Sequence, residues 1–208
     1  MELVLVRHGQ TKWNVEEIFR GRADIELNDP GLRQAELLGE FLAVPTIEAV
    51  YSSPLKRAMD TAASVARRHN LDVQLAPGLI DMDFGDWEGL QVEVVKQRYP
   101  AAYAAWTDHP EQANIPGGET LSQVRRRAMQ TVDQIVAAHS GRVVIVTHRV
   151  ILKLATLSLL GLDESSFWNI VVDTCGVTTF RAKGGRNILI RHNDNSFLNL
   201  PGAKLSDF

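Results

Sequence analysis

The chain has 208 residues, 45% hydrophobic and 23% charged, with a formal net charge of −3 at pH 7; this suits one domain over residues 1–208 and argues against a strongly basic nucleic-acid-binding protein. No apolar run is long enough to span a membrane, and Met1 leads directly into a core strand rather than a signal peptide, so we expect a cytoplasmic protein with no membrane partner. The single cysteine, Cys175, excludes an intramolecular disulfide and a cysteine metal cluster.

Strand-like and helix-like segments alternate along the chain, which predicts an α/β fold with a mostly parallel central sheet between helices. The first strand is expected at Leu3–Val6, because an unbroken run of leucine and valine suits a strand that is covered on both faces. Arg7 and His8 follow it directly, and a polar loop then runs to about Leu27. Ligands of open α/β folds bind at the carboxyl ends of the strands. An arginine and a histidine there suit an anion, because guanidinium grips phosphate oxygens and imidazole can act as a nucleophile.

The next segments are predicted to be a helix, a short strand and a second helix. Asn28 is expected to cap the first helix, which Pro45 ends. A strand at Ala49–Tyr51 leads to Ser53 and Pro54, which we interpret as the N-cap and the first residue of the second helix. The core face of the first helix is expected to consist of Leu32, Ala35, Leu38 and Leu42.

An irregular stretch from Gly78 to Pro116 follows another short strand at Val73–Leu75. Its glycines and prolines predict an inserted cap over the edge of the sheet. Aromatic residues in the insert either line a pocket for an organic group or pack the insert itself, which is the more common role. They include Phe84, Trp87, Tyr103 and Trp106.

The longest predicted helix follows the insert. Thr120 and Gln123 form a capping box at its start. The basic run 125–127 is expected on its solvated face. Its core face is expected to consist of Leu121, Val124, Ala128, Val132, Ile135 and Val136.

The last third of the chain contains a second buried strand at Val143–Val146. A helix is expected from about Val150 to Leu160, because the glycine that follows is a good helix terminator. Val177–Phe180 and Ile188–Ile190 are predicted to form a closing strand pair, and the residues from Asn193 onward are expected to form a mobile tail.

His8 and His148 each follow an apolar strand. If both strands are central and parallel, the two imidazoles emerge at the same edge of the sheet. Two histidines could instead hold a metal, but a metal site needs further ligands at recognisable spacing, and the chain has neither His-x-His nor His-Glu-x-x-His. We therefore expect no metal.

Several segments occur in the order of one known family. LVRHGQTKWN, FRGRADIELND, YSSPLKRAMDTA, LIDMDFGDWEG and PGGET resemble the signatures of the histidine phosphatase superfamily, also called phosphoglycerate mutase-like. The resemblance covers nearly the whole chain. It implies a three-layer phosphoglycerate mutase-like fold with a small cap at about 78–116. It also implies a hydrolase that acts on a small phosphomonoester without a cofactor.

The resemblance assigns roles to individual residues. Neutral His8 would attack phosphorus and form a phosphohistidine. Arg7, Arg57, Asn14 and a protonated His148 would stabilise charge on the phosphoryl oxygens. Weaker substrate contacts are implied for Thr11, Gly21, Glu119 and Arg149.

Two of these weaker contacts have alternatives. Glu119 could equally be a carboxylate that is favoured by the nearby helix terminus. Arg149 stands where many family members carry glycine, and it either adds a donor near the phosphate or turns outward.

The proton donor is where the chain departs from the family. The motif usually places glutamate at the position of Asp81, and aspartate is one methylene shorter, so its backbone must lie closer to the substrate. A general acid must first satisfy geometry. We favour Asp81 over Asp83, which can equally cap a turn, and Glu88 is a weaker competitor.

Three alternative functions remain. A cofactor-dependent phosphoglycerate mutase would transfer the phosphoryl group to a second hydroxyl instead of water. A non-catalytic phosphoprotein- or phosphate-binding module would have kept the pocket and lost turnover. A metal-dependent hydrolase would lose activity in chelator. Compact members of the family include phosphoserine, α-ribazole, sugar-phosphate and broad-specificity phosphatases. The resemblance at FWNIVVDTCGVTTF and FGDWEG favours the first two groups, but selectivity resides in the cap and is not read from the sequence. An exposed apolar helix or strand edge would support a homodimer.

Overall fold

The computed structural model describes residues 1–198, which fold around a six-stranded sheet with strand order β3-β2-β4-β1-β5-β6. The strands are β1 (Glu2–Arg7), β2 (Ala49–Ser52), β3 (Val73–Leu75), β4 (Arg142–Thr147), β5 (Val177–Lys183) and β6 (Arg186–Asp194). The helices are α1 (Lys12–Val15), α2 (Asp29–Phe41), α3 (Lys56–Arg68), α4 (Val92–Arg98), α5 (Pro100–Asp108), α6 (Leu121–Ala138) and α7 (Arg149–Leu160). Short 3₁₀ turns span Pro77–Leu79, Gly85–Trp87, Pro110–Gln112, Glu164–Asn169 and Ser196–Leu198.

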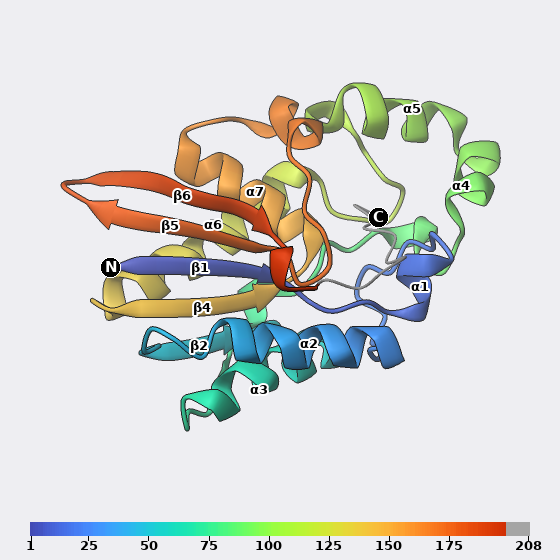
Figure 1. Cartoon of the computed structure of the whole chain (residues 1–208). Helices are drawn as coiled ribbons and strands as arrows, with labels where there is room; N and C mark the ends of the chain where they lie inside the picture. Colours follow the sequence, from blue (N-terminus) through green and yellow to red (C-terminus); the bar gives the residue numbers. More distant parts are fainter. Residues whose placement is uncertain (199–208) are drawn as a thin grey trace.

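The sheet is mostly parallel. β3, β2, β4 and β1 run side by side in one direction, β5 pairs with β1 in the antiparallel sense, and β6 pairs antiparallel with β5. Figure 1 shows α2 and α3 on one side of the sheet and α6 and α7 on the other. The predicted α/β fold with three layers is therefore confirmed.

Two apolar clusters fill the spaces between these layers. Successive residues of a strand point to opposite faces, so Val4 and Val6 pack towards α2 and α3, whereas Leu3 and Leu5 pack towards α6 and α7. Burial on both faces explains why β1 is an unbroken apolar run.

The insert contains two short helices, α4 and α5, which lie beyond the carboxyl ends of β1 and β4 in Figure 1. Trp87 and Trp106 are almost completely buried, and they belong to the same apolar cluster as Leu3 and Leu5. Packing is therefore the role of these two indoles.

Some local expectations were wrong. Leu32 is 48% exposed, because the buried stripe of α2 runs through Gly31, Ala35 and Leu38 and Leu32 lies about 100° around the helix from Gly31. The second helix begins at Lys56 rather than after Ser53. The reason is that the Ser53 N–H still donates to the Val146 carbonyl at 3.1 Å, which extends β2.

Residues 193–198, the described part of the expected mobile tail, belong to the folded domain. Asn193 belongs to β6, and Leu198 is buried against the α2–α3 side of the core. The remainder of the expected tail, residues 199–208, lies outside the described residues. Within 1–198, no helix has both the length and the apolar character that crossing a membrane requires.

Candidate active site

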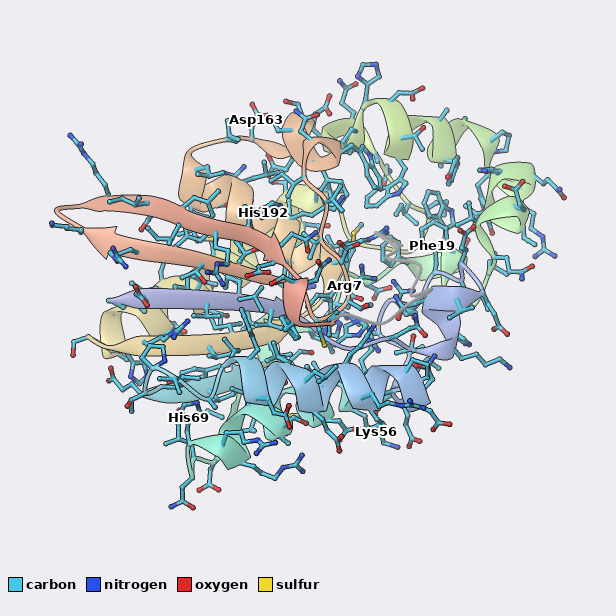
Figure 2. The ribbon with its side chains drawn as sticks, viewed as in Figure 1. Arg7, Phe19, Lys56, His69, Asp163 and His192 are labelled. Atoms are coloured by element: carbon cyan, nitrogen blue, oxygen red, sulfur yellow. The ribbon has the colours of Figure 1, made fainter. Side chains whose placement is uncertain are left out.

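The two sequence-predicted histidines meet at the carboxyl edge of the sheet. β1 and β4 are adjacent and parallel, with Arg7 opposite Thr147 in register, so His8 and His148 leave the sheet together. Their ring centroids lie 5.2 Å apart. The expectation that both strands are central and parallel is confirmed, and Figure 2 shows Arg7 inside the molecule at this edge.

His8 is held as a neutral imidazole with a defined tautomer. Its Nδ1 lies 2.7 Å from the carbonyl oxygen of Gly9, and because a carbonyl can only accept, Nδ1 carries the proton. Burial, followed by the charges of Arg57 and Arg7, lowers the pKa of His8 well below its ordinary value. Nε2 therefore keeps its lone pair, which is what a nucleophile needs.

His148 is completely buried and bonded to Ser53. Its Nε2 lies 2.7 Å from Ser53 Oγ, which also accepts the N–H of Leu55 at 3.4 Å. Nδ1 faces Asp81 Oδ2, an acceptor, at 3.7 Å. We therefore assign the imidazole proton to Nδ1 and the Ser53 hydroxyl hydrogen to the bond with Nε2.

The electrostatic surroundings of His148 affect its protonation state. Burial has the largest effect on the pKa of His148, followed by the charge of Arg57 and then that of His8, and together they lower it well below its ordinary value. The protein's own groups therefore favour the neutral imidazole, and the expected protonated His148 stays a prediction for the phosphoryl-bound site. The neutral ring still offers an Nδ1–H donor.

The two proposed phosphate-binding arginines are completely buried and oriented by backbone carbonyls. Arg57 donates to the carbonyls of Gly21 at 2.9 Å and Ala23 at 2.7 Å. Arg7 donates to the Val172 carbonyl at 2.6 Å. A guanidinium held in this way loses little further freedom when it binds an anion.

Asp81 brings a carboxylate to Arg57 and His148. Its Oδ2 lies 3.3 Å from Arg57 Nη2, and its side chain is 7% exposed. Asp83 instead accepts the N–H of Gly85 at 2.9 Å and pairs with the half-exposed Arg22. Glu88 accepts the backbone N–H groups of Arg22 and Phe84. Both competitors of Asp81 are thus engaged in shaping turns.

Thr11 and Asn14 form a capping box on α1. Asn14 Oδ1 accepts the backbone N–H and the hydroxyl of Thr11, each at 2.8 Å, and Thr11 Oγ1 accepts the Asn14 N–H. A sequence-predicted polar loop is therefore partly helical, and this mutual capping fixes the orientation of the Asn14 carboxamide.

Gly21, Glu119 and Arg149, the other residues implied as weaker substrate contacts, have different partners in the structure. The Gly21 backbone orients Arg57. Glu119 binds Arg127 and accepts the N–H of Asp83 at 3.0 Å, so it ties loops together. Arg149 is buried rather than turned outward, and its guanidinium lies 5.7 Å from the centre of the Trp168 ring.

Two residues near the histidines were missed by sequence reasoning. Arg20 is buried, donates to the Trp13 carbonyl at 3.3 Å and lowers the pKa of both histidines by its charge. Its position beside Gly21 in a family motif was the available signal. Ser53 was assigned to a helix cap, so its bond to His148 was not foreseen.

Over the described part of the chain, no three histidine, cysteine, aspartate or glutamate side chains form a cluster that could hold a metal ion. The arrangement offers a neutral imidazole nucleophile, a second imidazole donor, buried guanidinium groups and one buried carboxylate. These are the parts that a phosphoryl transfer requires.

Comparisons with known proteins agree with this geometry. Residues 3–195 match the family model described as histidine phosphatase superfamily (branch 1). Phosphoserine phosphatase 1 of Hydrogenobacter thermophilus is 33% identical over 194 residues, which cover 93% of this chain and 92% of that protein. The adenosylcobalamin/alpha-ribazole phosphatase of Escherichia coli is 30% identical, over 83% of this chain and 86% of its own. Among solved structures, Bacillus stearothermophilus YhfR has a TM-score of 0.90 at 31% identity, over 95% of this chain and 98% of that one.

Proposed function

The chain belongs to the histidine phosphatase superfamily (branch 1) and is a phosphatase; from this premise we propose that it hydrolyses a small phosphomonoester through a phosphohistidine on His8. The observation that carries the proposal is the juxtaposition of His8, His148, Arg57 and Asp81 at the ends of two adjacent parallel strands.

In the first step, Nε2 of His8 attacks phosphorus in line with the leaving oxygen. The N–P bond forms as the P–O bond to the alcohol breaks, and the leaving oxygen takes a proton from the Asp81 carboxyl group. A positioned acid contributes roughly 10²- to 10⁴-fold to such a step. The hydrogen bond from His8 Nδ1–H to Gly9 supports this role, because it aims the opposite nitrogen away from the backbone.

Charge on the transferring phosphoryl group is stabilised by Arg7, Arg57 and the Nδ1–H of His148. The negative charge of a bound phosphoryl group opposes the effect of the arginines on the pKa of His148, and so favours its protonated form. Asn14 adds an amide donor to the same group. Stabilisation of this developing charge is the main task in phosphoryl transfer.

In the second step, water attacks the phosphohistidine. The Asp81 carboxylate takes a proton from the water as the new O–P bond forms, and the N–P bond breaks to release phosphate and neutral His8. Asp81 thus returns to its protonated form, and no net proton is gained or lost over the two steps. The division of one hard hydrolysis into two steps is the benefit of the covalent intermediate.

The substrate class follows from the relatives, whose names specify phosphoserine and α-ribazole phosphatases. We propose phosphoserine, α-ribazole 5′-phosphate or a sugar phosphate, with the insert at 78–116 acting as the cap that selects among them. Its helices α4 and α5 lie beyond the strand ends that carry the histidines, which supports that role. A cytoplasmic location stays a prediction, and so does the homodimer.

Phosphate release from a panel of phosphomonoesters, measured with and without chelator, tests the proposal. The panel contains phosphoserine, α-ribazole phosphate, 3-phosphoglycerate and sugar phosphates. His8→Ala should abolish release, whereas His109→Ala, which changes an exposed histidine of the insert, should not. Substrate labelled with ³²P should give an acid-labile phosphoenzyme in the wild type only.

The other outcomes favour the alternatives. Phosphate release by His8→Ala at the wild-type rate would show that His8 is not the nucleophile. Phosphoryl transfer from 2,3-bisphosphoglycerate to phosphoglycerate, without net release, would identify a mutase. Tight binding of phosphomonoesters with no turnover would identify a binding module, and loss of release in chelator would identify a metal-dependent hydrolase.

A further inference from the structure

The segment that carries Asp81 is held by side chains rather than by a sheet. The carbonyls of four successive residues, 78 to 81, all accept side-chain hydrogen bonds. Thr147, the residue before His148, donates its hydroxyl to the Leu79 carbonyl at 2.7 Å. The other three carbonyls, those of Gly78, Ile80 and Asp81, accept from the guanidinium of Arg127 at 2.9, 2.7 and 2.9 Å.

Arg127 uses its whole hydrogen-bonding capacity here. A guanidinium has five N–H donors in a rigid plane. Nη1 and Nη2 serve the three carbonyls, while Nε and Nη2 also grip both carboxylate oxygens of Glu119 at 2.9 Å each. Five donors therefore meet five acceptors, and the side chain is only 22% exposed. The expectation of a solvated arginine at this position was wrong.

The backbone position of Asp81 decides where its carboxylate lies. Aspartate has a short side chain, and Asp81 Oδ1 is tied to the adjacent N–H of Met82 at 2.9 Å. Little freedom remains for the carboxylate to reach further if the backbone retreats. The fork of Arg127 reaches the Asp81 carbonyl directly, while Oδ2 stays 3.3 Å from Arg57.

We propose that Arg127 is a positioning residue for proton delivery by Asp81, an inference that rests on the proposed function. Arg127 does not touch the reacting groups. It holds the backbone of the proton donor at the distance that the short aspartate requires, and Glu119 extends the clamp to the N–H of Asp83.

A test of this role depends on the basicity of the leaving group. Phenyl phosphate and p-nitrophenyl phosphate have the same ring and reaction, but p-nitrophenolate leaves with little need of a proton, whereas phenolate needs one. A displaced acid therefore slows phenyl phosphate selectively. Hydrolysis of the phosphohistidine is the same for both esters, so the quantity to compare is kcat/KM, which reports its formation. Asp81→Asn should lower kcat/KM for phenyl phosphate by a larger factor than kcat/KM for p-nitrophenyl phosphate, roughly 10²-fold or more on the first ester.

Arg127→Gln should reproduce this selectivity in weaker form. The ratio of the two kcat/KM values, phenyl phosphate over p-nitrophenyl phosphate, should fall by about 10- to 100-fold, since a displacement of about 1 Å costs up to about 10² in rate. Arg127→Lys retains the charge but lacks the planar fork, so it should shift the ratio in the same direction. In the Asp81→Asn background, Arg127→Gln should slow both esters equally, because no acid remains to be positioned.

Arg125→Gln is the matched control. Arg125 lies on the same helix, is 26% exposed and donates to Glu164 and to the Leu162 carbonyl, on a different loop. Its loss should leave the ratio unchanged. If Arg127→Gln is poorly folded, the ratio measured with Arg127→Lys decides.

Each failure has a different meaning. Equal slowing of both esters by the Arg127 variants, or a ratio shift in Arg125→Gln, would overturn the positioning role while the proposed function stands. A wild-type ratio retained in Asp81→Asn would overturn the acid assignment and, with it, this inference. If the wild type hydrolyses neither ester and no compound of the panel above, the proposed function itself is overturned.

Discussion

Removal of the Ser53 hydroxyl is expected to weaken both stability and catalysis. Ser53 is completely buried, and its Oγ is the hydrogen-bond partner of His148 Nε2 at 2.7 Å. Ser53→Ala leaves that nitrogen and the Leu55 N–H without this oxygen, at a completely buried position. An unsatisfied buried group costs about 1 to 3 kcal/mol. For a chain of this size, the loss corresponds to a decrease in Tm of roughly 2 to 12 °C.

The catalytic effect follows from the tautomer of His148. Without the Ser53 hydroxyl, the imidazole proton can move to Nε2, and the Nδ1–H donor towards the phosphoryl group is lost for part of the population. A neutral hydrogen bond contributes about 0.5 to 1.5 kcal/mol net, so kcat should fall by about 2- to 13-fold.

The assay compares Ser53→Ala with Ser52→Ala. Ser52 is equally buried, and its hydroxyl donates to the Ser53 carbonyl at 2.8 Å rather than to a histidine. Thermal unfolding should report losses of stability of similar size in both variants. Only Ser53→Ala should lower kcat and change the tautomer of His148 in a long-range ¹H–¹⁵N spectrum. Equal kcat values, or an unchanged tautomer, would refute the reasoning.

Three further results are expected. Because burial and the arginines lower the pKa of both His8 and His148, the unfolded chain binds more protons below the ordinary value of 6.5, and stability should fall as the pH drops below it. The free energy of unfolding, measured by urea titration at several pH values, should fall by up to about 2.7 kcal/mol per pH unit for two groups. A urea midpoint that does not change between about pH 5.5 and 6.5 would contradict this. Gly31→Ala should destabilise by about 1 to 3 kcal/mol, since its Cβ would lie 2.0 Å from the backbone oxygen of Gln10, and an unchanged Tm would disprove that close approach. Burial keeps the Cys175 thiol protonated by raising its pKa, so a thiol reagent should label it only on unfolding; rapid labelling of the native protein would be inconsistent with this.

Local patterns were sufficient for most of the secondary structure. The capping box at Thr120 and Gln123 and the helix end at Gly161 were predicted correctly, because both depend on residues within one turn of each other. The strands that deliver His8 and His148 were also correct, because a continuous apolar run encodes burial on both faces.

The sequence by itself therefore determined the α/β class, the order of the family motifs and the candidate residues of the site. Only the tertiary structure decided what their side chains do. Arg127 lies in a run of three arginines that are alike in sequence, and its three carbonyl partners are 46, 47 and 49 positions away. The tautomer of His148 depends on Ser53, which is 95 positions away. Such partners are chosen by how helices and loops pack on the sheet, and a short-range pattern of residue types carries no information about that packing.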